Sequence, residues 1–187
     1  MIVPKSKPRW TREMAEKFKP AGAGSVWMLG VRGYYGDSMG VPGRNDRGIY
    51  DDAIFVISDD VFASFNANTD PSVTRTKVAV LKPGQWKYKV GVHGLSKPKE
   101  KRYKAWVQAA PVTVMRDRVA SGKWVGSYDD TGWFGINIHR GSKTSTSSLG
   151  CQTIYPTQWD AFFALSTLVA SQAKIVDVPY VLVETNG

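Results

Sequence analysis

The chain has 187 residues, of which 42% are hydrophobic and 22% are charged. This composition excludes the low hydrophobicity of disordered chains, and the length fits one domain of ordinary size, so we expect a single core built from residues 1–187. Lysine and arginine outnumber acidic residues by 25 to 16, giving a formal net charge of +9, which favours a polyanionic partner such as nucleic acid, anionic lipid or acidic wall polymer without choosing among them.

Cysteine usage and hydropathy exclude several classes of protein. A single cysteine rules out an internal disulfide framework and leaves a thiol free for chemistry. No apolar run is long enough for the core of a signal peptide or for a membrane span. We therefore expect a protein made in the cytoplasm without a signal peptide, which would reach an external target through another system. Two histidines and one cysteine fall short of the usual zinc ligand set, so we expect neither a metal nor a cofactor.

The N-terminal segment 1–22 is basic and contains one amphipathic pattern. Trp10, Met14 and Phe18 recur every four residues with charges between them, which predicts a short helix over 10–19 that Pro20 ends. Short apolar or alternating runs separated by Asp, Asn, Gly and Pro follow. These runs predict strands at 26–31, 53–57, 61–65, 77–81, 86–90, 103–109, 112–115, 133–138 and 180–183.

Two further segments complete the pattern. Residues 37–48 are rich in Gly, Arg and Asp and read as a long surface loop. At 158–171 the period of the apolar residues becomes helical, after the start signal Pro156-Thr157. The elements predict a β-rich α+β domain with mixed or antiparallel strands and one or two helices.

The segment 132–155 carries the residues with chemical potential. A predicted strand delivers His139 to a polar loop of Ser, Thr and Gly residues, and this loop returns to Cys151. A thiol with an ordinary pKa is mostly protonated at neutral pH and needs a base beside it to act as a nucleophile. His139 is the nearest base in the sequence, and it could later return the proton to a leaving amine. Gly150 lets backbone N–H groups around Cys151 approach an oxyanion.

Each residue of this segment also has an ordinary structural interpretation. A lone cysteine is usually a small buried hydrophobic residue, and a histidine at a strand end is often structural. His93, the other histidine, lies between Gly91 and Gly94 and could line the site or occupy a turn. Asp129 and Asp130 could orient an imidazole, but a turn is favoured.

The combined pattern resembles a known family. Ile136-Asn137-Ile138-His139-Arg140-Gly141, a loop of small residues and then Ser148-Leu149-Gly150-Cys151 is similar to the catalytic segment of L,D-transpeptidases of the YkuD type. The resemblance implies a β-sandwich, a Cys151 nucleophile, a catalytic His139, and attack on a carbonyl of a peptidoglycan stem peptide. Ser148, Gly150 and Cys151 match the family signature Ser-His-Gly-Cys.

The sequence departs from that family at two places. Leu149 stands where the family often has histidine, and Gln152-Thr153 replaces the part of the motif that ends in an arginine or asparagine. Arg140, next to His139 and Gly141, is a candidate for the missing carboxylate-binding charge because guanidinium pairs with carboxylate in bidentate fashion. We accordingly expect Ser148, Gly150, Arg140, Gly141 and His93 to form the oxyanion and substrate site.

The expected function is a cysteine-dependent peptidoglycan hydrolase or transpeptidase that acts as a monomer, most simply a phage-encoded lysin. Its positive charge suits an anionic envelope. A delivered L,D-transpeptidase-like toxin explains the same sequence. A basic module that binds wall or nucleic acid without catalysis is the rival from another class, although no recognisable nucleic-acid-binding motif is present.

Overall fold

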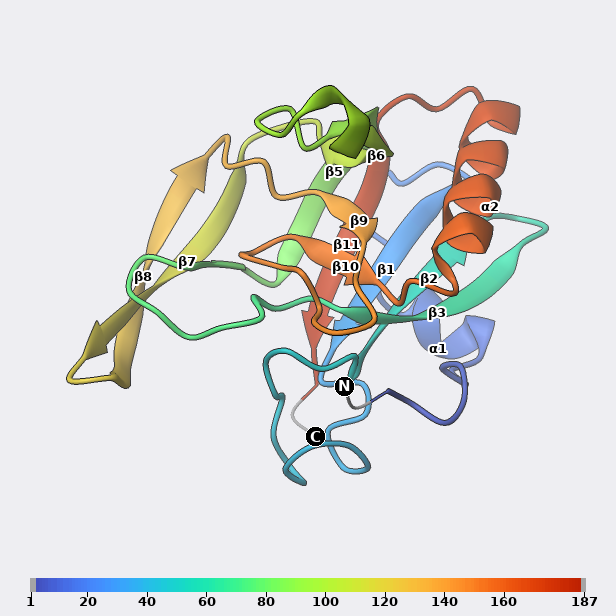
Figure 1. Ribbon diagram of the computed structural model, residues 1–187. Helices are drawn as coiled ribbons and strands as arrows, with labels where there is room; N and C mark the ends of the chain where they lie inside the picture. Colours follow the sequence, from blue (N-terminus) through green and yellow to red (C-terminus); the bar gives the residue numbers. More distant parts are fainter. Residues whose placement is uncertain (1–2, 186–187) are drawn as a thin grey trace.

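The computed structural model describes residues 3–185, and eight strands of this part form one sheet that closes on itself (Figure 1). Their order around the closed sheet is β1-β11-β5-β6-β9-β10-β3-β2. Pairing is antiparallel except at β1–β11 and β9–β10, which are parallel. The eight strands are β1 (Trp27–Arg32), β2 (Asp52–Ile57), β3 (Phe62–Asn68), β5 (Gly84–His93), β6 (Tyr103–Gln108), β9 (Ile138–Arg140), β10 (Gln152–Ile154) and β11 (Val178–Glu184).

A second, three-stranded antiparallel sheet has the order β4-β7-β8. It consists of β4 (Ala79–Leu81), β7 (Val112–Ala120) and β8 (Lys123–Gly132). The ends of β7 and β8 form a long hairpin that projects from the body of the molecule, at the left of Figure 1. Ion pairs of Lys82 with Asp129 and of Arg116 with Asp130 lie along this sheet.

The main hydrophobic core lies inside the closed sheet and under the base of the second sheet. Alternate residues of each strand point inward, such as Met28 of β1, Ile54 of β2 and Tyr180 of β11, and each has no exposed surface. Leu81 of β4 and Val114 of β7 belong to the same cluster. The two sheets therefore share one core, as expected of a single domain.

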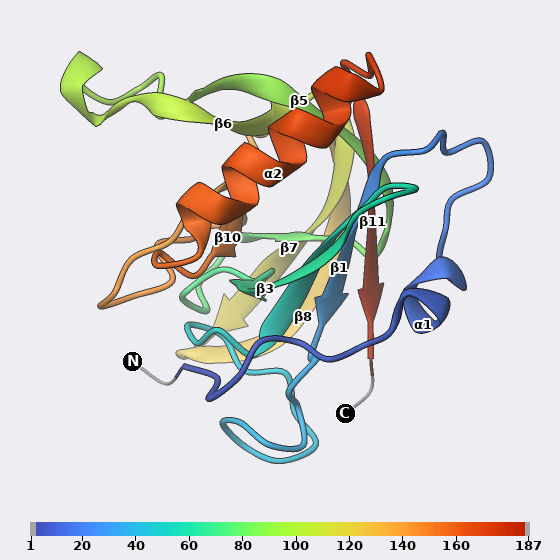
Figure 2. The same cartoon turned by 90° about the vertical axis from the view of Figure 1, so that its right-hand side faces the viewer.

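The N-terminal arm explains why β1 and β2 are buried on both faces. Residues Trp27, Leu29, Ala53 and Phe55 point outward, yet all are fully buried. The short helix α1 (Arg12–Glu16) and the aromatic residues beside it cover them, and Figure 2 shows the arm running across this side of the molecule. Thr11 caps α1 by accepting a hydrogen bond from the amide of Met14.

The second helix, α2 (Trp159–Gln172), packs its apolar face into the main core. Phe162 meets Phe65 of β3 edge to face, and the indole N–H of Trp106 on β6 donates to the Ser166 hydroxyl at 2.8 Å. Figure 2 shows α2 lying across the closed sheet, between the β5–β6 hairpin and β3. A single 3₁₀ turn, η1 (Lys99–Lys101), sits in the connection from β5 to β6.

These observations confirm the β-rich α+β domain with mixed and antiparallel strands and with helices near the predicted 10–19 and 158–171. The strand predicted at 133–138 is wrong, because residues 133–137 have no regular structure and only Ile138–Arg140 pairs as β9. The strands β8 and β10 were not predicted. The segment 37–48 is a loop, as expected.

Within residues 3–185, no helix combines the length and the apolar character needed to cross a membrane.

Candidate active site

One cavity of about 470 Å³ brings together the histidines and the cysteine. It lies between the β5–β6 connection and the two segments around β9 and β10. Its wall includes His93, Asn137, His139 and Cys151, and the other lining residues are Val92, Gly94, Leu95, Ser96, Lys97, Phe134, Gly135, Ser147 and Leu149. The cavity is thus lined by three of the seven predicted site residues, His93, His139 and Cys151.

Parallel pairing of β9 with β10 fixes the relation between the segments that carry His139 and Cys151. His139 is in register with Thr153, and the amide of Gln152 donates to the Asn137 carbonyl at 2.8 Å. Cys151 immediately precedes β10, as Asn137 immediately precedes β9. The prediction that local chain geometry would bring His139 and Cys151 to one place is therefore consistent with the shared cavity.

A backbone carbonyl fixes the tautomer of His139, which is buried. Its Nδ1 lies 2.9 Å from the carbonyl oxygen of Arg140 and 3.3 Å from the hydroxyl of Tyr103. Because a carbonyl oxygen can only accept, Nδ1 carries the hydrogen and donates it. The other ring nitrogen, Nε2, then has a free lone pair and can take a proton.

The thiol of Cys151 is half-buried and does not hydrogen-bond to His139 within the described part of the chain. The thiol points to the carbonyl of Gly135 at 3.3 Å, and the amide N–H of Asn137 donates to the sulfur at 3.5 Å. Cys151 is partly exposed and is one of the residues that line the cavity.

Ser148 and Gly150 shape the turn before Cys151. The buried hydroxyl of Ser148 donates to the Cys151 carbonyl at 2.6 Å and accepts from the Gly150 amide at 3.0 Å. Gly150 has φ of +135°, and a Cβ there would lie 2.7 Å from the carbonyl oxygen of Ala79. Both residues hold the loop before Cys151 in place, and the Gly150 N–H that we expected to face an oxyanion already has a partner.

Asn137 connects the two histidines and the cysteine. Its side-chain oxygen accepts from the Gln108 amide at 3.4 Å, which orients the amide group so that Nδ2 faces Nδ1 of His93 at 3.1 Å. His93 stacks on His139 with ring centroids 4.0 Å apart and an angle of 21° between the planes. The sequence analysis included His93 but gave Asn137 no role. The contacts of Asn137 with Gln108, His93 and Cys151 form only in the folded chain.

The electrostatics of the cavity favour neutral groups. Burial, and then the neighbouring His93, lower the pKa of His139 to about 3 against the hydrogen bond to Arg140. Burial also lowers the pKa of His93, as does the charge of Lys97. Burial raises the pKa of the Cys151 thiol, although the Asn137 amide and Lys97 act in the opposite direction. At neutral pH the cavity consequently holds a protonated thiol and a neutral imidazole.

Arg140 and Gly141 lie beside the cavity rather than in its lining. The exposed guanidinium of Arg140 sits over the ring of Tyr103 at 5.3 Å, while its carbonyl serves His139. A Cβ at Gly141 would lie 2.0 Å from the Tyr50 hydroxyl, so this glycine permits close packing. Binding of a substrate carboxylate by Arg140 stays a prediction.

Asp129 and Asp130 are strand residues of β8 and pair with Lys82 and Arg116. The group that orients His139 is instead the carbonyl of Arg140. Lys97 also lines the cavity, although it was not among the residues expected to form the site.

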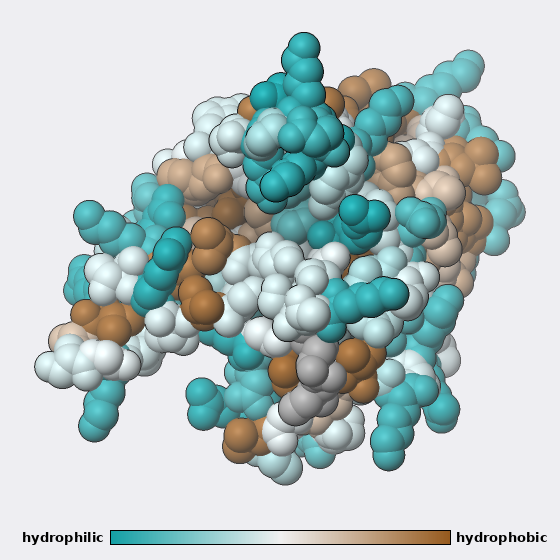
Figure 3. Space-filling model, viewed as in Figure 1, coloured by the Kyte–Doolittle hydropathy of each residue, from teal (hydrophilic) through white to brown (hydrophobic). Residues whose placement is uncertain are grey.

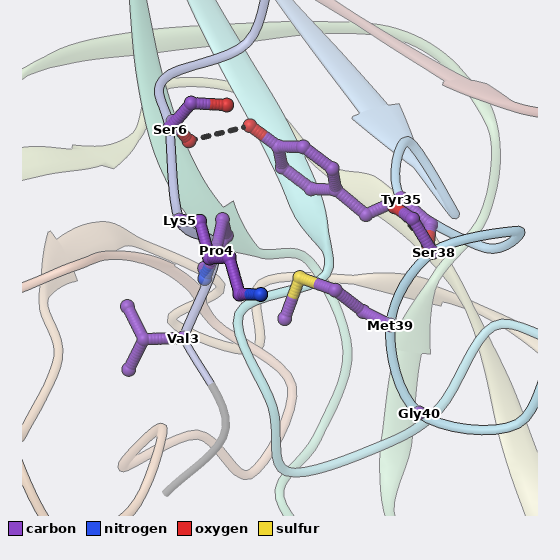
Figure 4. A pocket seen from close by; sticks show the side chains of 8 residues that line it. All are labelled: Val3, Pro4, Lys5, Ser6, Tyr35, Ser38, Met39 and Gly40. Carbon is purple, nitrogen blue, oxygen red and sulfur yellow. Dashed lines mark hydrogen bonds between the residues drawn. The ribbon is translucent and has the colours of Figure 1, made fainter.

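A second cavity, of about 430 Å³, lies under the N-terminal arm (Figure 4). The hydroxyl of Tyr35 donates to the Ser6 carbonyl at 2.9 Å across it, and Met39 faces it from the loop that follows β1. Its lining contains no histidine, cysteine or carboxylate.

Comparison with protein-family models, curated proteins and solved structures gave no match. Among residues 3–185, no group of three or more His, Cys, Asp and Glu side chains is arranged to hold a metal ion.

Proposed function

We propose that the chain is a cysteine-dependent enzyme that attacks an amide carbonyl in peptidoglycan stem peptides, with Cys151 as nucleophile and His139 as base. The observation that carries this proposal is the cavity shared by Cys151 and a His139 whose Nδ1 is committed to a carbonyl. The resemblance of Ile138-His139 and Ser148-Leu149-Gly150-Cys151 to the L,D-transpeptidase segment supports the substrate class. We also propose that the sheets are arranged as in the β-sandwich of that family.

In the proposed first step the thiol leaves the Gly135 carbonyl and turns toward His139. Nε2 takes the proton, the sulfur bonds to the carbonyl carbon, and the carbonyl oxygen becomes an oxyanion. The Cys151 amide donates to no acceptor in the described residues, so its N–H is available to that oxygen.

In the second step the C–N bond of the substrate breaks, and His139 returns its proton to the departing amine. Water or a second amine then attacks the thioester, which gives hydrolysis or transpeptidation and releases Cys151. His139 begins the cycle without a proton, because its pKa is lowered to about 3. Asn137 supports the cycle through its N–H contact with the sulfur and its contact with His93.

In the organism we place this activity in a phage-encoded lysin that degrades the cell wall. The net charge of +9 supports binding to an anionic envelope.

The test is digestion of purified muropeptides followed by mass analysis of the products. Wild type should release or transfer a stem-peptide fragment, and Cys151→Ser should not. His139→Gln should lower the rate by at least about 100-fold through loss of general-base catalysis. Lys123→Met, at the exposed tip of β8, is a control that should retain full activity.

Two results would overturn the proposal. Wild type that leaves every stem-peptide substrate unchanged would exclude the enzyme, and full activity of Cys151→Ser would exclude the nucleophile. Salt-dependent binding of DNA by a protein whose thiol resists alkylation would point to the binding module instead.

A further inference from the structure

Part of the cavity wall comes from the end of β5 and from its connection to β6. Val92 of β5 and Leu95 and Lys97 of the connection line the cavity, together with the apolar side chains of Phe134 and Leu149. Figure 2 shows this connection and the loop that leads to Cys151 both at its left-hand side. A ligand in this cavity can therefore contact Lys97 and aliphatic side chains as well as Cys151.

Every ionisable group that lines the cavity is neutral or positive. The lining contains Lys97, His93, His139 and Cys151 but no aspartate or glutamate. Lys97 also forms no salt bridge with an acidic residue of the described chain. Its charge acts on all three other groups, since it contributes to the pKa of His93, His139 and Cys151.

The backbone fixes the place from which Lys97 acts. Its amide donates to the Gly94 carbonyl at 2.8 Å, and its carbonyl accepts from Nε of Arg102 at 2.7 Å. A Cβ at Gly94 would lie 3.4 Å from Cδ of Lys97, so the lysine stem runs across this glycine. Beyond it the connection is strongly hydrophilic, as the teal surface at the top of Figure 3 shows.

We infer that Lys97 forms an anion subsite at the mouth of the cavity, which selects ligands with a carboxylate beside an aliphatic or peptide stem that reaches Cys151. This inference rests on the proposed function for its natural substrate, a peptide that keeps a free carboxylate near the attacked bond. It assigns to Lys97 the role that the sequence first suggested for Arg140, whose guanidinium lies over Tyr103.

Two alkylating reagents test the subsite without any peptidase assay. Iodoacetate and iodoacetamide deliver the same CH₂ group to sulfur with loss of iodide, but only iodoacetate carries a carboxylate. The ratio of their rates at Cys151, the only cysteine, measures the preference for an anion. Lys97→Met should lower the iodoacetate-to-iodoacetamide ratio about fivefold, the upper range for an exposed ion pair. Added salt should lower the ratio in wild type as well.

Two variants serve as controls for this measurement. Lys97→Arg should keep the ratio, because it keeps the charge. Lys99→Met removes a lysine two residues away that does not line the cavity, and it should also leave the ratio unchanged. An unchanged ratio in Lys97→Met, or an equal loss in Lys99→Met, overturns the subsite. No alkylation of the native protein by either reagent would refute both the subsite and the proposed nucleophile.

Stem peptides with a free C-terminal carboxylate and with a carboxamide give the second measurement. Lys97→Met should raise KM for the carboxylate about fivefold with little change in kcat, and it should leave KM for the carboxamide unchanged. Equal changes for both peptides contradict the subsite. An anion preference in alkylation without any peptide product contradicts the proposed function alone.

Discussion

Gly150 offers a measurement of how tightly the loop before Cys151 is packed. Its φ of +135° is a backbone conformation that side chains rarely adopt. A Cβ would also lie 2.7 Å from the Ala79 carbonyl oxygen and 3.1 Å from both the Cβ of Ala79 and the Cδ1 of Ile136. Ala79 belongs to β4, so its carbonyl cannot move away without disturbing the pairing with β7.

The expected cost of Gly150→Ala has two parts. The unfavourable φ should cost about 1–3 kcal/mol. Forcing a methyl group against a fixed backbone oxygen should cost about 1–3 kcal/mol more. Gly150→Ala should therefore lower the free energy of unfolding by about 2–6 kcal/mol.

The variant Gly126→Ala allows the backbone cost to be measured apart from the packing cost. Gly126 has φ of +128°, and a Cβ there would meet no atom within 4 Å. Gly126→Ala should show the backbone cost alone, so the difference between the two variants should be about 1–3 kcal/mol. Urea unfolding followed by tryptophan fluorescence measures both values. If Gly150→Ala were no less stable than Gly126→Ala, the packing of the loop against β4 would be refuted.

Two predictions concern pH. The ring of His139 should keep the NMR shifts of a neutral imidazole from pH 8 to pH 5, since its pKa is lowered to about 3; a midpoint near 6.5 in a protein that remains folded would contradict its burial. Burial raises the pKa of Asp51 to about 7, so the fold binds this proton more tightly than the unfolded chain does, and the resulting stability is lost as pH rises from about 4 to 7. Asp51→Asn stays neutral, so its unfolding free energy should exceed that of wild type more at pH 8 than at pH 4; the opposite order in urea unfolding would reject this assignment.

The elements that bury an apolar stripe could be predicted from the sequence. The helical spacing of Trp159, Phe162 and Val169 gave α2 to within a residue or two. The hairpin of β7 and β8 could not be found in this way, because most of β8 is exposed and its apolar and polar residues do not alternate. Cross-strand pairs such as Thr113 with Thr131 stabilise it.

The segment 133–137 shows the opposite error, because a strand was predicted there and the structure has none. It is apolar enough to suggest a strand, but the side chain of Gln108 takes the place of a neighbouring strand. Its oxygen accepts from the amides of Phe134 and Ile136, at 3.2 and 3.3 Å. The contact depends on β6 lying next to this segment, and local sequence carries no sign of that.

The candidate site also contains residues that could be predicted from sequence spacing and residues that could not. His139 and Cys151 are joined by a short loop, so their proximity could be inferred from spacing. His93 and Lys97 reach the cavity only because the β5–β6 hairpin folds beside β9, through the pairing of Trp106 with Ile138. Contacts of this kind depend on the whole sheet and cannot be predicted from sequence motifs.

The parallel pairing of β1 with β11 has a consequence for the synthesis of the protein. Met28 is in register with Tyr180, and β11 in turn pairs with β5. One edge of β1 pairs with β2, but its other edge pairs with β11, which is synthesised more than a hundred residues later. Contacts so distant in sequence form slowly. Because β11 lies between β1 and β5, the eight-stranded sheet can close only after residues 178–184 have been synthesised.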